Sequence, residues 1–130
     1  ITDDDGNVTE IHCTYDPETK SGSGFTGRKV KGTIQWVCAE TAERAEVRLY
    51  ENIVDEEKGV YNEDGTINVN PNSLTILENC YVEPALAEAK PMDSFQFVRQ
   101  GYFCVDSKDS TEDHLVFNRI VSLKSSYRPK

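Results

Sequence analysis

The segment FQFVRQGYFCVDSKDS, residues 95–110, places hydrogen-bonding side chains among aromatic ones. Gln96 carries an amide that both donates and accepts hydrogen bonds, and Arg99 carries a planar fork of N–H donors. A buried strand rarely holds such polar groups, and an exposed strand rarely holds so many aromatic rings. The mixture therefore fits neither an ordinary buried strand nor an ordinary exposed one.

The residues that could support catalysis or bind calcium are not arranged for either. Nothing in the sequence places His12 or His114 beside a nucleophile. When Gly65 is aligned with the invariant glycine of a calcium loop, Val60 and Pro71 fall at positions that require carboxylates. These residues favour a binding module over an enzyme.

The four cysteines predict free thiols. They are too far apart in the sequence for a zinc site, whose ligands come in closely spaced pairs, so we expect no metal. Each lies beside apolar or aromatic residues, which is typical of small buried side chains. An extracellular module is the alternative, because the cysteine count is even and 7–9 form a glycosylation sequon. We expect a cytoplasmic protein. The cysteines are Cys13, Cys38, Cys80 and Cys104.

The start of the chain does not suggest a signal peptide. The first residues are acidic and lack an apolar signal segment, and no apolar run is long enough to span a bilayer. The chain also lacks an initiator methionine, from which we expect a fragment of a longer protein.

The charge is strongly negative but unevenly distributed. A net charge of −9 argues against nucleic-acid binding, since counterion release requires a basic surface. Acidic residues concentrate in 1–18, 51–64 and 78–93, whereas RKVK at 28–31 and the last twelve residues are net basic. Charge alone therefore does not exclude an RNA partner.

Alternation of apolar and polar residues predicts a β-rich fold. In VKGTIQWVC, residues 30–38, every second side chain is apolar or small, and AEVRLY, residues 45–50, repeats the alternation. The other expected strands are 8–16, 73–82, 94–98, 101–106 and 115–123. The side chains expected to face inward are Ile34, Trp36, Val47, Leu49 and Phe117.

One short helix completes the expected elements. Pro84 suits a first helical turn and Pro91 ends the helix, which places it within 83–90. Short strands with one helix predict an all-β domain, and closure into an antiparallel β-barrel would remove exposed strand edges. Residues 51–72 are the most polar segment and are expected to form an acidic loop with little rigid structure, within a single domain 1–130.

Several segments of the chain have distinctive amino-acid sequences and occur in a fixed order. They are EIHCTYDPET, GRKVKGTIQWV, AEVRLYE, NPNSL, VEPALAEA, FQFVRQGYFCVDSKDS and VFNRIVSL. In this order they resemble the C-terminal part of glutaminyl-tRNA synthetases, class I enzymes that join glutamine to its tRNA with ATP and Mg²⁺. The resemblance runs from about residue 8 to residue 124 and is poorest in the acidic loop. It implies a β-barrel anticodon-binding fragment without the catalytic domain, which needs no cofactor itself and is inactive alone.

The resemblance also implies roles for individual residues. In the family, the glutamine and arginine that correspond to Gln96 and Arg99 contact the anticodon around its middle uracil. An unbroken strand would point two residues three positions apart to opposite faces, so a bulge or a strand end near Gly101 is expected. The basic segment 28–31 contains candidate phosphate contacts, although a solvated strand edge is the alternative. These candidates are Arg28, Lys29 and Lys31.

The resemblance implies tRNA(Gln) and the protein's own N-terminal catalytic domain as partners, with no membrane or DNA partner, and we expect a monomer. One alternative is the glutamyl-tRNA synthetase of archaeal and eukaryotic type, which shares the barrels. Another is a structural RNA-binding barrel similar to the ribosomal protein that binds 5S rRNA. The sequence motif GYFCVDSKDS favours the glutamine enzyme over these alternatives.

Overall fold

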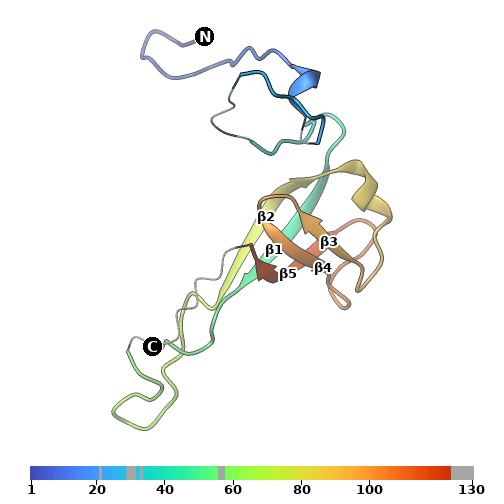
Figure 1. Ribbon diagram of the computed structural model, residues 1–130. Coiled ribbons are helices and arrows are strands. Elements are labelled where there is room, and N and C mark those ends of the chain that lie inside the picture. Colours follow the sequence, from blue (N-terminus) through green and yellow to red (C-terminus); the bar gives the residue numbers. More distant parts are fainter. Residues whose placement is uncertain (21, 29–31, 33, 56–57, 124–130) are drawn as a thin grey trace. The chain divides into compact units, whose positions relative to one another are not determined.

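The computed structural model describes residues 1–20, 22–28, 32, 34–55 and 58–123 of the chain (Figure 1). The chain divides into two compact units, Ile1–Ile34 and Gln35–Lys130. The second unit contains every named strand and the main hydrophobic core.

Five strands of the second unit form one sheet (Figure 1). The strands are β1 (Glu43–Tyr50), β2 (Leu74–Val82), β3 (Ser94–Phe97), β4 (Gly101–Val105) and β5 (Leu115–Ser122). Their order across the sheet is β2-β1-β5-β4-β3. The first and last residues of each strand lie within two residues of the bounds that the apolar–polar alternation predicted.

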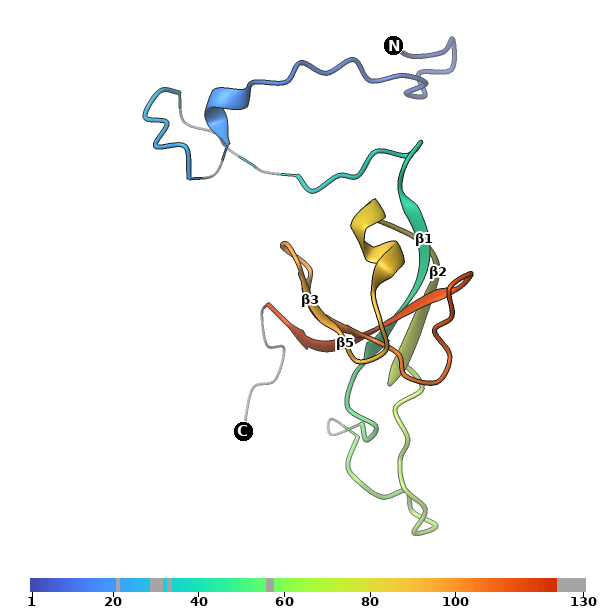
Figure 2. The ribbon, with the colours of Figure 1, turned by 90° about the vertical axis from the view of Figure 1, so that its right-hand side faces the viewer.

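The all-β class is confirmed, but the expected closed antiparallel barrel is only loosely matched. The described strands form an open sheet, with β2 and β3 at its two edges. Three strand pairs are antiparallel, whereas β1 and β5 run parallel to each other. The sheet curls around its core instead of lying flat (Figure 2), as expected for strands that twist and carry bulges.

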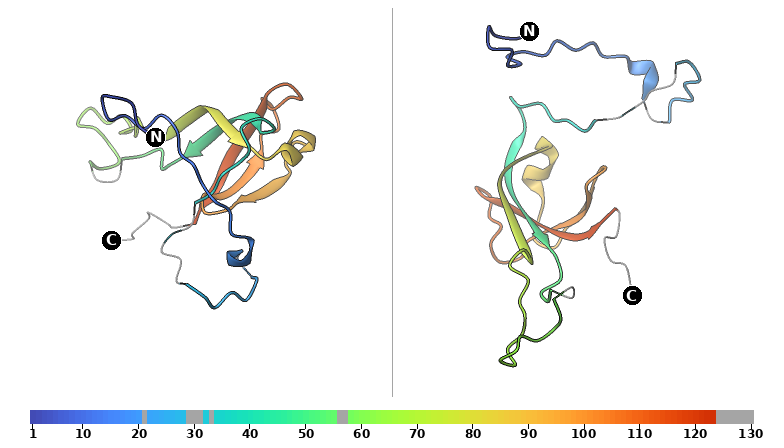
Figure 3. Two further views of the ribbon diagram at one scale, coloured as in Figure 1. Left: turned by 90° about the horizontal axis from the view of Figure 1, so that it is seen from above. Right: turned by 90° about the vertical axis from the view of Figure 1, so that its left-hand side faces the viewer.

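The expected short helix is present as the 3-10 helix η2 (Pro84–Glu88). Pro84 occupies its first turn, where its missing N–H costs no hydrogen bond. The Ala89 N–H closes the turn on the Leu86 carbonyl. Leu86 and Ala89 also pack against the core, so η2 covers the inner side of the curled sheet (Figure 3). Among the described residues, no helix is long and apolar enough to cross a membrane.

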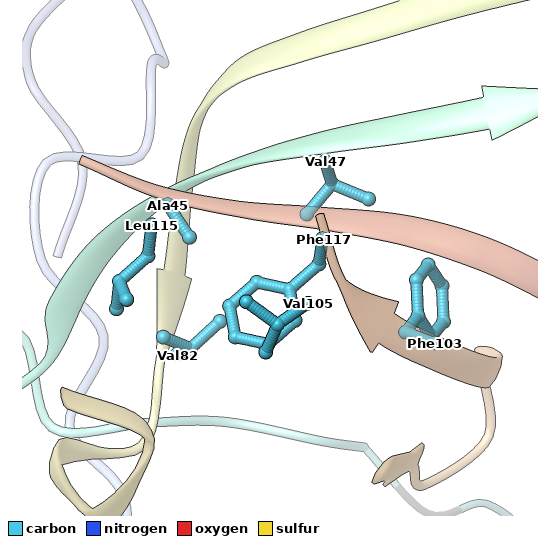
Figure 4. Packing of buried hydrophobic residues seen from close by; sticks show 7 residues of the cluster. All are labelled: Ala45, Val47, Val82, Phe103, Val105, Leu115 and Phe117. Carbon is cyan, nitrogen blue, oxygen red and sulfur yellow. The ribbon is translucent and has the colours of Figure 1, made fainter. Parts of the chain in front are cut away.

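The core forms on the inner face of the sheet (Figure 4). Its buried members are Ala45, Val47, Val82, Phe103, Val105, Leu115 and Phe117. The expectation that Val47 and Phe117 face inward is confirmed, and Leu49 is half-buried against the same cluster. Alternation along each strand explains this, because every second side chain points to one face.

Three phenylalanines of the opening segment complete this core. Phe97 stacks on Phe103 with ring centroids 4.5 Å apart, and it meets the Phe117 ring edge-on at 5.3 Å. Phe95 also approaches the Phe117 ring edge-on, at 6.3 Å. These geometries are the ones that aromatic pairs prefer. The aromatic residues of 95–110 are therefore mainly anchors of the sheet.

Two expected strands are not formed among the described residues. Of residues 30–38, positions 30, 31 and 33 lie outside the described residues, and 34–38 form no strand. Ile34 and Trp36 are 82% and 69% exposed, so the expectation that they face inward is wrong. Residues 8–16 contain only an isolated bridge, between Val8 and Thr2. Both segments alternate, but among the described residues neither forms the ladder of backbone hydrogen bonds that defines a strand.

The first unit, residues 1–34, is held by local hydrogen bonds. Among the residues of this unit that the structure describes, the one helical element is the 3-10 helix η1 (Pro17–Thr19). The Asp16 carboxylate caps it by accepting from the Glu18 N–H at 3.2 Å. None of its described residues is buried.

The acidic segment between β1 and β2 is more regular than expected. It continues both strands as a hairpin, with cross-strand bridges between Val54 and Val69 and between Tyr61 and Ile67. Backbone hydrogen bonds join its two legs: the Glu51 N–H donates to the Ser73 carbonyl at the base, and the Asn62 N–H donates to the Thr66 carbonyl near the tip. The polarity of 51–72 therefore does not prevent it from forming paired structure.

All four cysteines are free thiols, as expected. Their expected burial is wrong for Cys13 and Cys38, which are exposed, whereas Cys80 and Cys104 are half-buried.

Candidate functional site

Gln96 is presented to solvent by the edge strand β3. Phe95 and Phe97 on either side of it point into the core, so alternation turns Gln96 outward. Among the described residues, none forms a hydrogen bond with the Gln96 amide. Its donor and acceptor are therefore available to a partner.

Tyr102 lies directly opposite Gln96 on the neighbouring strand, and Val121 lies opposite Tyr102 on β5. Opposite residues of paired strands share a face of the sheet. Tyr102 is 43% exposed and Val121 is 50% exposed, so the amide, an aromatic ring and an apolar side chain form a row across β3, β4 and β5. The sequence reasoning did not single out Tyr102, although alternation from Gln96 across a hairpin could have found it.

Arg99 lies in the turn that joins β3 to β4. The turn spans residues 98–100, and the Gln100 N–H donates to the Phe97 carbonyl at 2.8 Å. Arg99 adopts the left-handed conformation, with φ of 68°. The expected interruption between Gln96 and Arg99 is therefore a strand end. The structure leaves both side chains exposed on one hairpin.

Gly101 fixes where this turn closes. A Cβ atom at this position would lie 2.6 Å from the Val121 carbonyl oxygen, well inside van der Waals contact. Its φ of 153° is also one that residues with side chains rarely adopt. The glycine therefore lets β4 run close to β5 directly after the turn.

The expected phosphate contacts are only partly described. Lys29 and Lys31 lie outside the described residues. Arg28 lies in the first unit, is 68% exposed and forms an ion pair with Asp16 at 3.0 Å. Arg119, in the basic C-terminal segment, donates to the Tyr50 carbonyl and pairs with Glu51, so that guanidinium is already engaged.

A groove of about 630 Å³ lies on the inner side of the sheet in the second unit. Most of its lining is apolar, with Trp36, Leu77 and Phe95 among its walls, and the polar residues Gln35, Glu83 and Arg119 also line it. Among the described residues, no three of the His, Cys, Asp and Glu side chains are grouped to hold a metal ion. The groove is thus suited to apolar contacts more than to acid–base chemistry.

Asp106, which follows β4, organises the loop that leads to β5. Its carboxylate accepts the backbone N–H groups of Lys108 and Asp109 at 2.8 Å each and the Asn118 amide at 2.6 Å. These hydrogen bonds lower the Asp106 pKa to about 2, and the one from the Asp109 N–H contributes most. The Arg48 guanidinium, 3.7 Å away, makes a smaller contribution. The turn-forming end of FQFVRQGYFCVDSKDS is therefore a structural loop.

Arg48 ties the same loop to β1. Its guanidinium contacts Glu46 and Asp109 at 2.6 Å each, and these carboxylates raise the Arg48 pKa. The Arg48 side chain is only 18% exposed, so the network is shielded from water on one side. The other carboxylate oxygen of Glu46 lies 3.4 Å from the His114 ring.

Replacing Asp106 by alanine should destabilise the fold by about 2 kcal/mol at pH 7, the free energy that corresponds to the lowered pKa. Because the folded-state pKa is depressed, this contribution is complete above about pH 4 and is lost as the pH falls towards 2. Urea unfolding of the wild type and the variant at pH 7 and pH 2 measures it.

The control for this experiment is Asp113→Ala, because Asp113 is an exposed carboxylate on the same loop. We expect it to change the free energy of unfolding little at either pH. An Asp106→Ala defect that persists undiminished at pH 2 would contradict the assignment.

Residues 33–106, more than half of the chain, match the family of tRNA synthetases class I (E and Q), anti-codon binding domain. The chain belongs to this family. The matched region of this anticodon-binding domain runs through β1, β2, β3 and β4, and so contains Gln96, Arg99 and Tyr102.

Curated relatives place the chain within the glutamine branch of the family. It is 55% identical to the glutamine–tRNA ligase of Clostridium perfringens over 134 residues, which cover 100% of this chain and 24% of that protein. It is 54% identical to the glutamine–tRNA ligase of Clostridioides difficile, covering 99% of the chain and 24% of that protein. The enzyme of Vibrio parahaemolyticus is 49% identical, with 96% and 22% covered.

The resemblance to glutaminyl-tRNA synthetases is therefore confirmed, and it is favoured over the glutamyl and ribosomal-protein alternatives. The chain spans about a quarter of the length of the relatives that it matches.

Proposed function

We propose that this chain is the part of a glutaminyl-tRNA synthetase that binds the anticodon of tRNA(Gln). The observation that carries the proposal is the β3–β4 hairpin of a family member, on which Gln96 and Arg99 are both exposed and unpaired among the described residues. Single-stranded anticodon bases are recognised by hydrogen bonds to their edges and by stacking on aromatic rings.

Each group on the hairpin has a task in this proposal. The Gln96 amide offers one donor and one acceptor, which complement the Watson–Crick edge of the middle uracil. The exposed Tyr102 ring next to it offers a surface for base stacking. Arg99 projects from the turn, where its planar guanidinium reaches a base edge or a phosphate.

A net charge of −9 is compatible with this role if the module makes a few directed contacts. Most phosphate binding then belongs to the rest of the synthetase, and Arg28, Lys29 and Lys31 are candidates for a local share. Glutamine attachment belongs to the protein's own N-terminal catalytic domain, which uses ATP and Mg²⁺. In this proposal the full-length protein is cytoplasmic and monomeric, and the present chain alone catalyses nothing.

The test replaces Gln96 by alanine in the full-length synthetase. We expect kcat/KM for charging of tRNA(Gln) to fall by the equivalent of ~1–3 kcal/mol, the usual contribution of a specific base contact. The loss should be much smaller for a tRNA whose middle anticodon base is already altered, because the contact is missing in both cases. Steady-state charging kinetics with the two tRNAs measure the difference.

Gln100→Ala is the matched control, because Gln100 carries the same exposed amide in the same hairpin. It should leave discrimination at the middle base unchanged. If Arg99 holds a phosphate, Arg99→Ala should weaken charging by a similar factor for both tRNAs. A Gln96→Ala enzyme that keeps full discrimination at normal thermal stability would overturn the proposal.

A further inference from the structure

Two turns of the same kind enclose the edge strand β3. In each, the N–H of the fourth residue donates to the carbonyl of the first, at 2.9 Å in residues 90–93 and at 2.8 Å in residues 97–100. The third residue of each turn has a positive φ, 74° at Met92 and 68° at Arg99. Glycine or asparagine ordinarily occupies this place, as in type II turns. Both turns therefore carry a long side chain where the backbone favours none.

A side chain at these two places destabilises its turn. In the left-handed conformation the Cβ atom lies too close to the following carbonyl oxygen. Glycine removes this crowding, although its greater freedom in the unfolded chain offsets part of the gain. The net penalty for a side chain is about two- to five-fold in the equilibrium between the closed and the open turn.

Contacts within the fold do not account for arginine at position 99. The Arg99 side chain is exposed, and among the described residues none forms a hydrogen bond, an ion pair or a ring contact with it. Each of the other described arginines has a carboxylate or an aromatic ring as its partner; they are Arg28, Arg44, Arg48 and Arg119. The unfavourable backbone at Arg99 is thus not compensated by the side chain that causes it.

We propose that arginine is kept at position 99 although it destabilises the turn, because this position sets a guanidinium within reach of the RNA that Gln96 reads. The inference rests on the proposed function and adds that the site is strained before RNA binds. Backbone strain of this kind is characteristic of binding sites, where the surrounding structure holds it in place. Met92 carries the same strain at the other end of β3, but its thioether offers no charge to a phosphate or a base edge.

The test compares glycine and alanine at position 99 in the full-length synthetase. Amide hydrogen exchange in β3 and β4 without tRNA measures the stability of the hairpin, and charging kinetics with tRNA(Gln) measure recognition. We expect Arg99→Gly to slow the exchange by about two- to five-fold, because it relieves the strain. It should lower kcat/KM for charging by about 10- to 150-fold, the usual effect of losing a hydrogen bond from a charged group. Arg99→Ala should lower charging equally but leave the exchange unchanged, because alanine keeps the Cβ atom.

Met92→Gly is the matched control, because Met92 is 68% exposed and has the same backbone conformation. It should slow the exchange as Arg99→Gly does and leave charging unchanged. Gln100→Gly is the opposite control, because φ at Gln100 is not positive. Glycine there adds only flexibility, so the exchange should become faster.

Two results would overturn the inference. One is exchange in Arg99→Gly as fast as in Arg99→Ala, which would mean that no strain is released. The other is charging by Arg99→Gly at the wild-type rate, which would mean that the arginine is not kept for the RNA. The first result leaves the proposed function standing, because exchange is measured without tRNA. The proposed function fails separately, through unchanged discrimination in the Gln96→Ala enzyme.

Discussion

Replacing Phe117 by alanine is expected to destabilise the sheet by about 3–5 kcal/mol, the usual cost of removing a fully buried phenylalanine ring. Phe117 is 0% exposed, and its ring contacts the rings of both Phe95 and Phe97. The cavity would therefore lie under the hairpin that carries the candidate RNA contacts. Chemical denaturation followed by Trp36 fluorescence or circular dichroism measures the change in the free energy of unfolding.

Ile120→Ala is the control for Phe117→Ala, because Ile120 lies on the same strand but is 57% exposed. We expect the control to cost less than about 1 kcal/mol. Similar losses for the two variants would mean that Phe117 is not the centre of the core.

Replacing Gly101 by alanine should cost about 2–4 kcal/mol, from steric overlap and an unfavourable φ. The added Cβ atom would meet the Val121 carbonyl oxygen, which belongs to the backbone and moves only if the β4–β5 ladder shifts. Since the turn with Arg99 ends at this glycine, the variant should also weaken anticodon recognition in the full-length protein. Denaturation and charging kinetics of one variant measure both effects.

Gly32→Ala provides the comparison, because nothing lies within 4 Å of a Cβ atom at that position. It should leave the free energy of unfolding within about 0.5 kcal/mol of the wild type. If Gly101→Ala changed the free energy of unfolding as little as Gly32→Ala, the inference that β4 approaches β5 too closely for a side chain at position 101 would be wrong.

The strands that the sequence predicts correctly are those whose partners are also described. Residues 45–50 alternate, and the chain supplies β2 and β5 to pair with them. Residues 8–16 alternate just as well, yet among the described residues they form only the isolated bridge between Val8 and Thr2. The alternation of apolar and polar residues predicts which face of the sheet each side chain takes once its strand is paired. Whether the strand forms depends on backbone hydrogen bonds to a neighbouring strand.

The acidic hairpin was missed for a different reason. Its polar composition suggested an unstructured loop, but the asparagines that make it polar also donate hydrogen bonds across it. Sequence composition counts polar groups without showing which of them are paired within the segment.

The geometry of the candidate site was partly predictable. Gln96 and Arg99 were chosen as candidates before the fold was known, and Gly101 signalled the strand end that separates them. The left-handed conformation of Arg99 was not predictable, because arginine rarely adopts it and the turn geometry depends on the β3–β4 register. The outward position of Tyr102 depends on the same register.

The parallel pairing of β1 with β5 means that the sheet cannot be completed until two strands distant in the sequence have come together. Ala45 pairs with Leu115, whereas the β1–β2 and β3–β4 pairs each join strands that follow one another in the sequence. Closing so long a loop has an entropic cost before any core contact forms, and folding is slower when contacts are distant in sequence. On the ribosome, the two hairpins can form as they emerge, but the side chains around Phe117 stay exposed until β5 has been synthesised. Until that strand arrives, the nascent chain exposes apolar side chains that the finished sheet buries, and such exposure favours aggregation.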